Sequence, residues 1–148
     1  MAVSSDTGNF SYGNTTPGAL RLVAEMVEEG LNLPRLREAL ENNWKESRLR
    51  LWGLAMQETR ILEDGRLAAA LITLDALRSC GAGREDAEGL VEQLRRLYGV
   101  RVALVLREEE KDGKVQTKAS LRSSGSDNVR DVAAQFGGGG HRNAAGAT

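Results

Sequence analysis

The 148-residue sequence has little of several residue types, and each scarcity excludes a class of protein. Its one cysteine, Cys80, excludes an internal disulfide and is typical of the reducing cytoplasm. Its one histidine, His141, excludes a metal site built from several histidines of this chain. No apolar run approaches the roughly 18 residues of a membrane span, and we see no signal peptide. The net charge of −1 provides no strong overall field toward nucleic acid or membrane.

Glycine, in contrast, is abundant. The chain has 17 glycines, and five of them fall between Gly137 and Gly146. From Lys114 to the last residue there are also five Lys or Arg but only two Asp or Glu. A segment that is both glycine-rich and locally basic is where we expect an anionic ligand.

The hydrophobic pattern predicts an α/β fold, a small mixed sheet flanked by helices. Residues 66–74 form a near-continuous apolar run, as in a strand buried on both faces. A helix is expected over 85–97, a strand over 100–106, a hairpin turn at 111–114 and a helix over 128–136. The strand after the turn alternates strictly, so that one of its faces carries Lys114, Gln116, Lys118, Ser120 and Arg122.

Ahead of this sheet the pattern is helical. One helix is expected to begin at Thr16-Pro17 and to end at Gly30. A second stretch, from Asn32 to about Leu62, is unusually long for a globular helix, so we expect a break or kink near Gly53. Such a helix is a plausible connector between two lobes.

The segment FGGGGHRNAAG, residues 136–146, is the strongest local feature. Successive glycines let backbone N–H groups converge on an anion and let a ligand approach the backbone closely. A helical turn is expected over 141–145, and its free N–H groups would add to the site. His141 and Arg142 would stand at its edge, and Arg122 on the preceding strand could grip a phosphate through two hydrogen bonds. The pattern therefore favours a phosphate or a nucleotide phosphodiester as ligand.

Simpler interpretations stay open for each of these residues. The glycine run is also compatible with an unstructured tail, His141 with a surface histidine, and Arg122 with a solvated charge on a strand. Asp6 stands where α/β proteins place metal-binding or catalytic carboxylates, but Asp-Thr-Gly also forms an ordinary turn. One carboxylate alone does not hold a divalent ion.

Taken together, these segments resemble the DHH-family phosphoesterases. Residues 136–146 are similar to the GGGHxxAAG signature of the DHH-associated domain, and residues 119–123 to its substrate-facing strand. Residues 5–16 are similar to the last catalytic motif of the family. The resemblance implies a remnant of the catalytic domain over 1–32, a connecting helix over 33–63 and the substrate-binding DHH-associated domain over 64–148.

The resemblance also implies site residues. Those implied to bind substrate are Arg122, Ser123, Gly138, Gly139, Gly140, His141, Arg142 and Asn143. Asp6 matches one ligand of a site for two metal ions, usually Mn2+. The sequence has no Asp-His-His triplet, so it holds no complete catalytic set, and we expect this chain to be inactive as a hydrolase on its own.

The implied function is the substrate-binding portion of a cytoplasmic, metal-dependent phosphoesterase. Its substrates would be short oligonucleotides, linear dinucleotides or nucleoside bisphosphates. The expected partners are such a ligand, the N-terminal DHH domain and a second copy in a homodimer, with no membrane. A different interpretation is an RNA-binding or dimerisation module without hydrolysis, as at the C-terminus of alanyl-tRNA synthetases. A third is a structural piece with an inert glycine loop.

Overall fold

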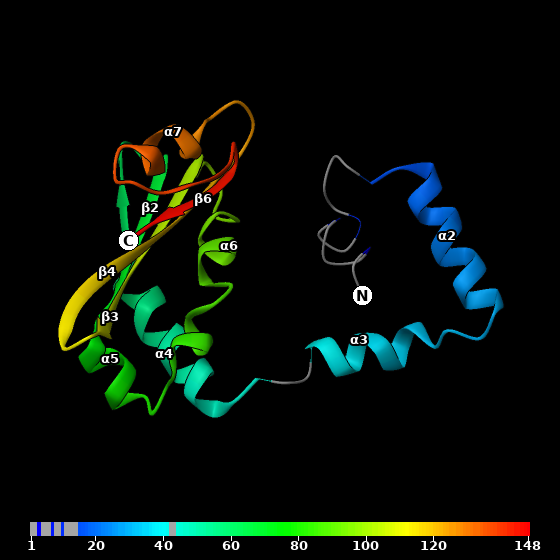
Figure 1. The fold of residues 1–148 in the computed structure, drawn as a ribbon, viewed down its shortest axis with the longest axis horizontal. Coiled ribbons are helices and arrows are strands. Elements are labelled where there is room, and N and C mark those ends of the chain that lie inside the picture. The colour runs from blue at the N-terminus through cyan, green and yellow to red at the C-terminus, as the bar shows by residue number, and fades with distance from the viewer. Residues whose placement is uncertain (1–2, 4–6, 8–9, 11–14, 42–43) are drawn as a thin grey trace. The chain divides into compact units, whose positions relative to one another are not determined.

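The computed structural model describes residues 3, 7, 10, 15–41 and 44–148. The chain forms two units, Met1–Asn43 and Trp44–Thr148, which we call unit 1 and unit 2 (Figure 1). Asp6 lies outside the described residues. Within the part of the chain that is described, no helix is both long enough and apolar enough to cross a membrane.

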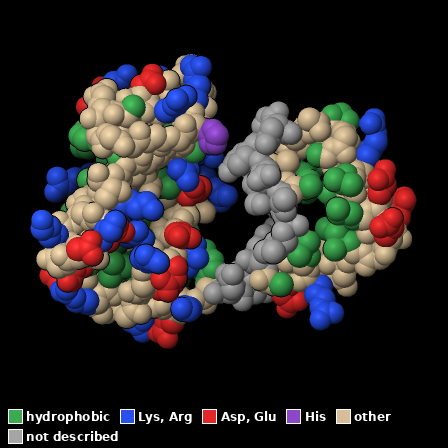
Figure 2. Space-filling view, in the orientation of Figure 1, with side chains coloured by type: hydrophobic (Ala, Val, Ile, Leu, Met, Phe, Trp, Pro, Cys, Tyr) green, Lys and Arg blue, Asp and Glu red, His purple; other side chains and the backbone are tan. Residues whose placement is uncertain are grey.

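Unit 1 contains the helices α2 (Pro17–Glu28) and α3 (Leu33–Glu41). The predicted start of α2 is confirmed, because the Thr16 side chain caps the helix by accepting a hydrogen bond from the Ala19 N–H at 3.2 Å. Gly30 follows the helix with a φ of 100°, a conformation that favours glycine. None of the α2 residues is buried within the described structure, and hydrophobic side chains gather on the surface of this unit (Figure 2).

The prediction of one long helix kinked at Gly53 is wrong. Helix α3 ends at Glu41 and α4 (Glu46–Gln57) begins after Lys45, whose backbone is extended. Gly53 lies inside α4, where glycine costs about 1 kcal/mol relative to alanine. Buried Leu51 and Trp52 anchor α4 in the core of unit 2, and this packing outweighs the local weakness at Gly53.

Unit 2 is built around a six-stranded mixed sheet in the order β1-β2-β3-β4-β6-β5, which confirms the predicted fold class. Strands β2 and β3 are parallel and the other neighbouring pairs are antiparallel. The strands are β1 (Arg60–Leu62), β2 (Leu67–Ile72), β3 (Val102–Lys111), β4 (Lys114–Ser123), β5 (Gly139–His141) and β6 (Ala144–Ala147). The predicted turn joins β3 and β4, with Asp112 and Gly113 both at positive φ.

Two predicted elements differ in the structure. Residues 141–145 are not a helical turn but part of the β5–β6 hairpin, because β6 pairs with β4 and completes its hydrogen bonding. Strand β2 is buried on one face only, and Leu71 on the other face is 48% exposed. The apolar run there reflects small and large hydrophobic residues that alternate between a covered and an open face.

The helices of unit 2 cover different halves of the two sheet faces. Helices α4 and α6 (Leu90–Leu94) pack on one face, over β2 and β3. Helix α7 (Val129–Ala134) packs on the opposite face, over β4, β5 and β6 (Figure 1). The short helices α5 (Leu74–Ser79) and η1 (Arg84–Ala87) complete the unit. The predicted helix over 85–97 is split into η1 and α6 by Gly89, whose φ is 88°.

Candidate functional site

The face of β4 opposite to α7 is the centre of the candidate site. In the antiparallel register, Arg122 lies beside Ala144 of β6, and Ala144 lies beside His141 of β5. Directly paired residues point to the same face of a sheet, so these three side chains share one face. In the same way Ser120 lies level with Gly146 and Gly139. This half of the face therefore carries polar side chains on β4 and almost bare backbone on β5 and β6.

A cleft of about 360 Å³ lies between β4 and the segment that joins η1 to α6. It is lined by Ala87, Glu88, Gly89, Val91, Glu92, Val105, Arg107, Lys118, Ser120 and Arg122. Three cationic side chains and two carboxylates thus meet in one small space, next to a hydroxyl group. Such a cluster of hydrogen-bond donors and cations is suited to a phosphate group.

Arg122 is held in the cleft by an ion pair with Glu92 of α6. Both Nε and Nη2 of Arg122 approach Oε1 of Glu92, at 2.9 and 2.8 Å, and Nη1 donates to the Leu121 carbonyl at 2.9 Å. About 30% of each side chain is exposed, so the pair is within reach of a ligand. The second Glu92 oxygen, Oε2, is buried and finds no hydrogen-bond partner among the described residues.

Arg107 is a second guanidinium in the cleft, and the sequence analysis missed it. Its Nη1 donates to the Arg84 carbonyl at 2.7 Å and its Nη2 to Glu109 at 2.9 Å. The hydrogen bond that Gln116 donates to Glu109, together with the Arg107 charge, lowers the pKa of that carboxyl. Arg107 lies directly across from Lys118 in the β3–β4 register. That pairing is the signal that would have found it.

The glycines of the hairpin allow close contact between the backbones of neighbouring strands. They do not precede a helix, so they do not form the anion-binding turn that the sequence analysis expects there. A β-carbon at Gly138 would lie 2.1 Å from the Gly146 carbonyl oxygen, and one at Gly140 would lie 2.5 Å from the Ala144 oxygen. A β-carbon at Gly139 would instead meet nothing within 4 Å. Two of the three implied binding glycines are thus required by close strand contacts, while Gly139 faces open space.

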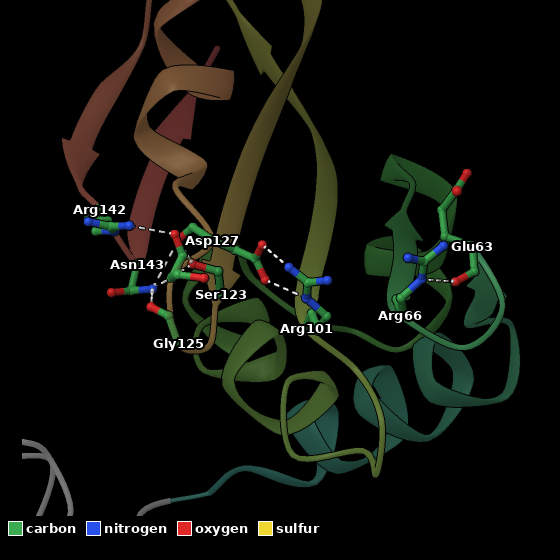
Figure 3. A network of polar contacts seen from close by, with 9 residues as sticks. Glu63, Arg66, Arg101, Ser123, Gly125, Asp127, Arg142 and Asn143 are labelled. Atoms are coloured by element: carbon green, nitrogen blue, oxygen red, sulfur yellow. Dashed lines mark hydrogen bonds and ion pairs between the residues drawn. The ribbon is translucent and has the colours of Figure 1, made fainter.

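Ser123, Arg142 and Asn143 take part in a network that holds the loop between β4 and α7 (Figure 3). Nδ2 of Asn143 lies within 3.2 Å of Ser123 Oγ and of the carbonyl oxygens of Gly125 and Asp127. Arg142 donates to the Ser126 carbonyl at 2.6 Å.

The same loop is tied to the sheet by an ion pair. Arg101 forms a bidentate ion pair with Asp127. The hydrogen bond from this guanidinium is the chief cause of the lowered pKa of Asp127. Figure 3 shows both hydrogen bonds between Arg101 and Asp127.

The eight implied binding residues therefore occupy four places. Arg122 lines the cleft. Gly139 and His141 lie on β5, two strands from Arg122 and on the same sheet face, and both are exposed. Ser123, Arg142 and Asn143 belong to the loop network, and Gly138 and Gly140 to the close strand contacts of the hairpin. Lys118 and Ser120, whose strand face was predicted correctly, line the cleft beside Arg122.

The described residues do not provide a metal site. No three His, Cys, Asp or Glu side chains of the described ranges come together. Asp6, matched to a metal ligand, lies outside those ranges. A divalent ion needs several oxygen or nitrogen ligands, so the described residues do not fit the two-metal site that the resemblance implies.

Several known proteins are similar to this chain over nearly its whole length. A bifunctional oligoribonuclease and PAP phosphatase, NrnA, from Thermus thermophilus is 36% identical over 146 residues, and the protein of the same name from Bacillus subtilis is 32% identical over 149 residues. These alignments cover 99% of this chain but only 42% and 44% of the two relatives. The crystal structure of an exopolyphosphatase-related protein from Bacteroides fragilis superposes with a TM-score of 0.88 at 29% identity, over 98% of this chain and 42% of that one.

The sheet, the cleft and the glycine hairpin define an α/β domain of the type that accompanies phosphoesterases. Residues 67–148 match the model of the DHHA1 domain, so the chain belongs to the DHHA1 domain family. The resemblance to DHH-family phosphoesterases, inferred from residues 5–16, 119–123 and 136–146 together, is confirmed. The chain spans less than half the length of these curated relatives.

Proposed function

We propose that unit 2 binds a phosphate group of a short oligonucleotide, a linear dinucleotide or a nucleoside bisphosphate in the cleft beside β4. The observation that carries the proposal is the convergence of Lys118, Ser120 and Arg122 from one strand face with Arg107 from the next strand. The NrnA relatives support the ligand class, since their name describes action on oligoribonucleotides and PAP.

The open sheet face beside the cleft supports a ligand longer than one phosphate. A phosphate at Arg122 would leave the rest of a dinucleotide above Ala144, Gly146 and Gly139, where the surface has little side-chain bulk. His141 stands at the far side of this surface, where its ring can contact a ribose or a second phosphate. Binding through such phosphate contacts weakens as salt is added.

For the whole protein we propose hydrolysis of a phosphodiester or phosphomonoester in the cytoplasm, with Mn2+ as the cofactor that would supply the activation of water. Asp6 is the one residue of this sequence matched to a metal ligand, and it lies outside the described residues. The described residues therefore support only the binding part of the proposal.

Calorimetric titration of the 148-residue chain with pApA tests the proposed binding. Arg122→Ala removes a charge-assisted contact of about 1.5–3 kcal/mol, so we expect the dissociation constant to rise at least tenfold. Arg130→Ala is the matched control, because Arg130 is exposed on α7 and α7 covers the opposite sheet face. We expect less than a twofold change there. Equal losses in both variants, or no binding by the wild type, would contradict the proposal.

A second candidate is an RNA-binding module without hydrolysis. An A-adding tRNA nucleotidyltransferase from Aquifex aeolicus is 28% identical over 146 residues, although the match covers only 17% of that protein. A titration with tRNA beside pApA separates the two candidates. Tighter binding of tRNA, lost in Arg122→Ala, would favour the RNA-binding module, and tighter binding of pApA the proposal above.

A further inference from the structure

The cleft holds its principal cation against an internal anion. The Arg122 guanidinium contacts Glu92 through two nitrogens, and both contacts are made to the single oxygen Oε1. Glu92 lies on α6 and Arg122 on β4, so the pair joins the two walls of the cleft. A phosphate that binds Arg122 must therefore share this cation with a carboxylate that is already there.

The pair is not explained by fold stability. Both side chains are about 30% exposed, and ion pairs with such access to water contribute little. The Oε2 atom of Glu92 is buried without a hydrogen-bond partner among the described residues, which adds a desolvation cost. Because this carboxylate is kept in the cleft at such a cost, its position points to a role in ligand binding.

The negative charge of Glu92 lowers the affinity of the cleft for an anionic ligand, and this reduction grows with the negative charge of the ligand. A phosphate on Arg122 would lie roughly 6 Å from the Glu92 carboxylate, which is the distance expected for two anions on one guanidinium. At a water-like dielectric, one unit of ligand charge at this distance lowers the affinity about threefold, and two units lower it about tenfold. Phosphodiesters carry one negative charge, whereas a terminal phosphate carries nearly two above its second pKa of about 6.

We propose that Glu92 is a specificity-determining residue of the cleft: it orients Arg122 and lowers the affinity for dianionic terminal phosphates relative to monoanionic phosphodiesters. This inference rests on the proposed function, since it concerns a ligand that binds Arg122. It assigns to α6 a part in substrate choice that neither the glycine hairpin nor the strand motif suggests.

The test compares two ligands that differ by one charge. AMP is a dianion at pH 8, and adenosine 5′-methyl phosphate is a monoanion with the same nucleoside. Calorimetric titration of the 148-residue chain gives the dissociation constants of both. Glu92→Gln removes the charge but keeps an oxygen that can accept the Arg122 hydrogen bonds. Glu110→Gln is the matched control, because Glu110 is exposed on β3 and does not line the cleft.

We expect Glu92→Gln to tighten AMP about tenfold and the methyl ester about threefold, so that the ratio of the two constants changes about threefold. Glu110→Gln should change the affinity for both ligands alike and by less than twofold, because water and salt screen an exposed charge outside the cleft. Weaker binding in Glu92→Gln, or an equal change for both ligands, would overturn the inference while leaving the proposed function intact. A wild-type chain that binds neither ligand would instead overturn the proposed function.

A second variant keeps the test decisive if Glu92→Gln does not fold. Glu92→Ala removes the same charge, and it should shift the ratio of the two constants in the same direction although it leaves Arg122 less well oriented. An unchanged ratio in a folded Glu92→Ala protein would contradict the inference. Folding of each variant is checked by the fluorescence of Trp52, which is buried in unit 2.

Discussion

Among the glycines of unit 2, Gly138 has the least room for an added β-carbon. A β-carbon there would lie 2.1 Å from the carbonyl oxygen of Gly146, and 2.7 Å from the Cα of Ala147. Both are backbone atoms of β6, a strand that pairs with β4 and β5 at once. The β6 backbone is hydrogen-bonded on both sides, so it cannot move away from an added methyl group as the end of a flexible side chain could. Gly139, the next residue, offers a control because its β-carbon would meet nothing within 4 Å.

Gly138→Ala should therefore destabilise unit 2 while Gly139→Ala should not. Overpacking at a site that cannot relax costs roughly 1–3 kcal/mol, and partial loss of the β6 pairing adds to it, so we expect about 2–4 kcal/mol for Gly138→Ala. For a domain of about 100 residues this corresponds to a fall in Tm of about 10–20 °C. Gly139→Ala should stay within about 1 kcal/mol.

Thermal unfolding followed by tryptophan fluorescence measures this difference. Both tryptophans, Trp44 and Trp52, belong to unit 2, so the signal reports that unit alone. Far-ultraviolet circular dichroism of the two variants at low temperature checks that each begins from the same fold. Equal falls in Tm for the two variants, or an unchanged Tm in Gly138→Ala, would refute the assignment of the glycine run to a tightly paired hairpin.

Two further predictions concern the loop after β4. The pKa of Asp127 is lowered by Arg101, so the pair stabilises the fold fully above the ordinary value of about 4, and the contribution is lost as pH falls through the lowered value. Between pH 5 and pH 2 the Tm of the wild type should therefore fall further than that of Asp127→Asn. Parallel falls in the two proteins would contradict a stabilising Arg101–Asp127 pair. Asn143→Ala loses the donor to three oxygens and should cost about 1–3 kcal/mol in urea unfolding. Asn143→Asp should cost more, because a carboxylate would face those oxygens; a smaller cost would be inconsistent with the network.

Local patterns in the sequence predicted the sheet well. Alternation along residues 114–122 placed Lys118, Ser120 and Arg122 on one face, and the structure brings them together in the cleft. The Asp112-Gly113 turn and the Thr16 cap were also predictable, because each depends on a few adjacent residues.

Features that depend on distant contacts were not predictable in the same way. The hairpin over residues 139–147 forms because β6 finds a partner in β4, some 25 residues earlier, whereas the local sequence has helical preference. Helix α4 includes Gly53 because Leu51 and Trp52 pack into the core of unit 2. In both cases tertiary packing overrides the local propensity.

The composition of the site was predicted only in part. Arg122 could be named from the sequence because a motif carries it, but Glu92 and Arg107 come from α6 and β3 and have no motif of their own. The place of Arg107 follows from the β3–β4 register, in which it pairs with Lys118. The place of Glu92 follows from the packing of α6, which no local pattern records. Ser123 and Asn143, also implied by the motif, make structural hydrogen bonds within the loop network.

Phosphate binding in the cleft beside β4 can be mapped by NMR, from the backbone amide shifts during titration with pApA. We expect saturable shifts at residues 87–92 and 118–122, with smaller shifts at Gly139 and His141 and none at the exposed residues of α7. Shifts confined to residues 124–128 and 142–143, or none at millimolar pApA, would contradict phosphate binding in this cleft.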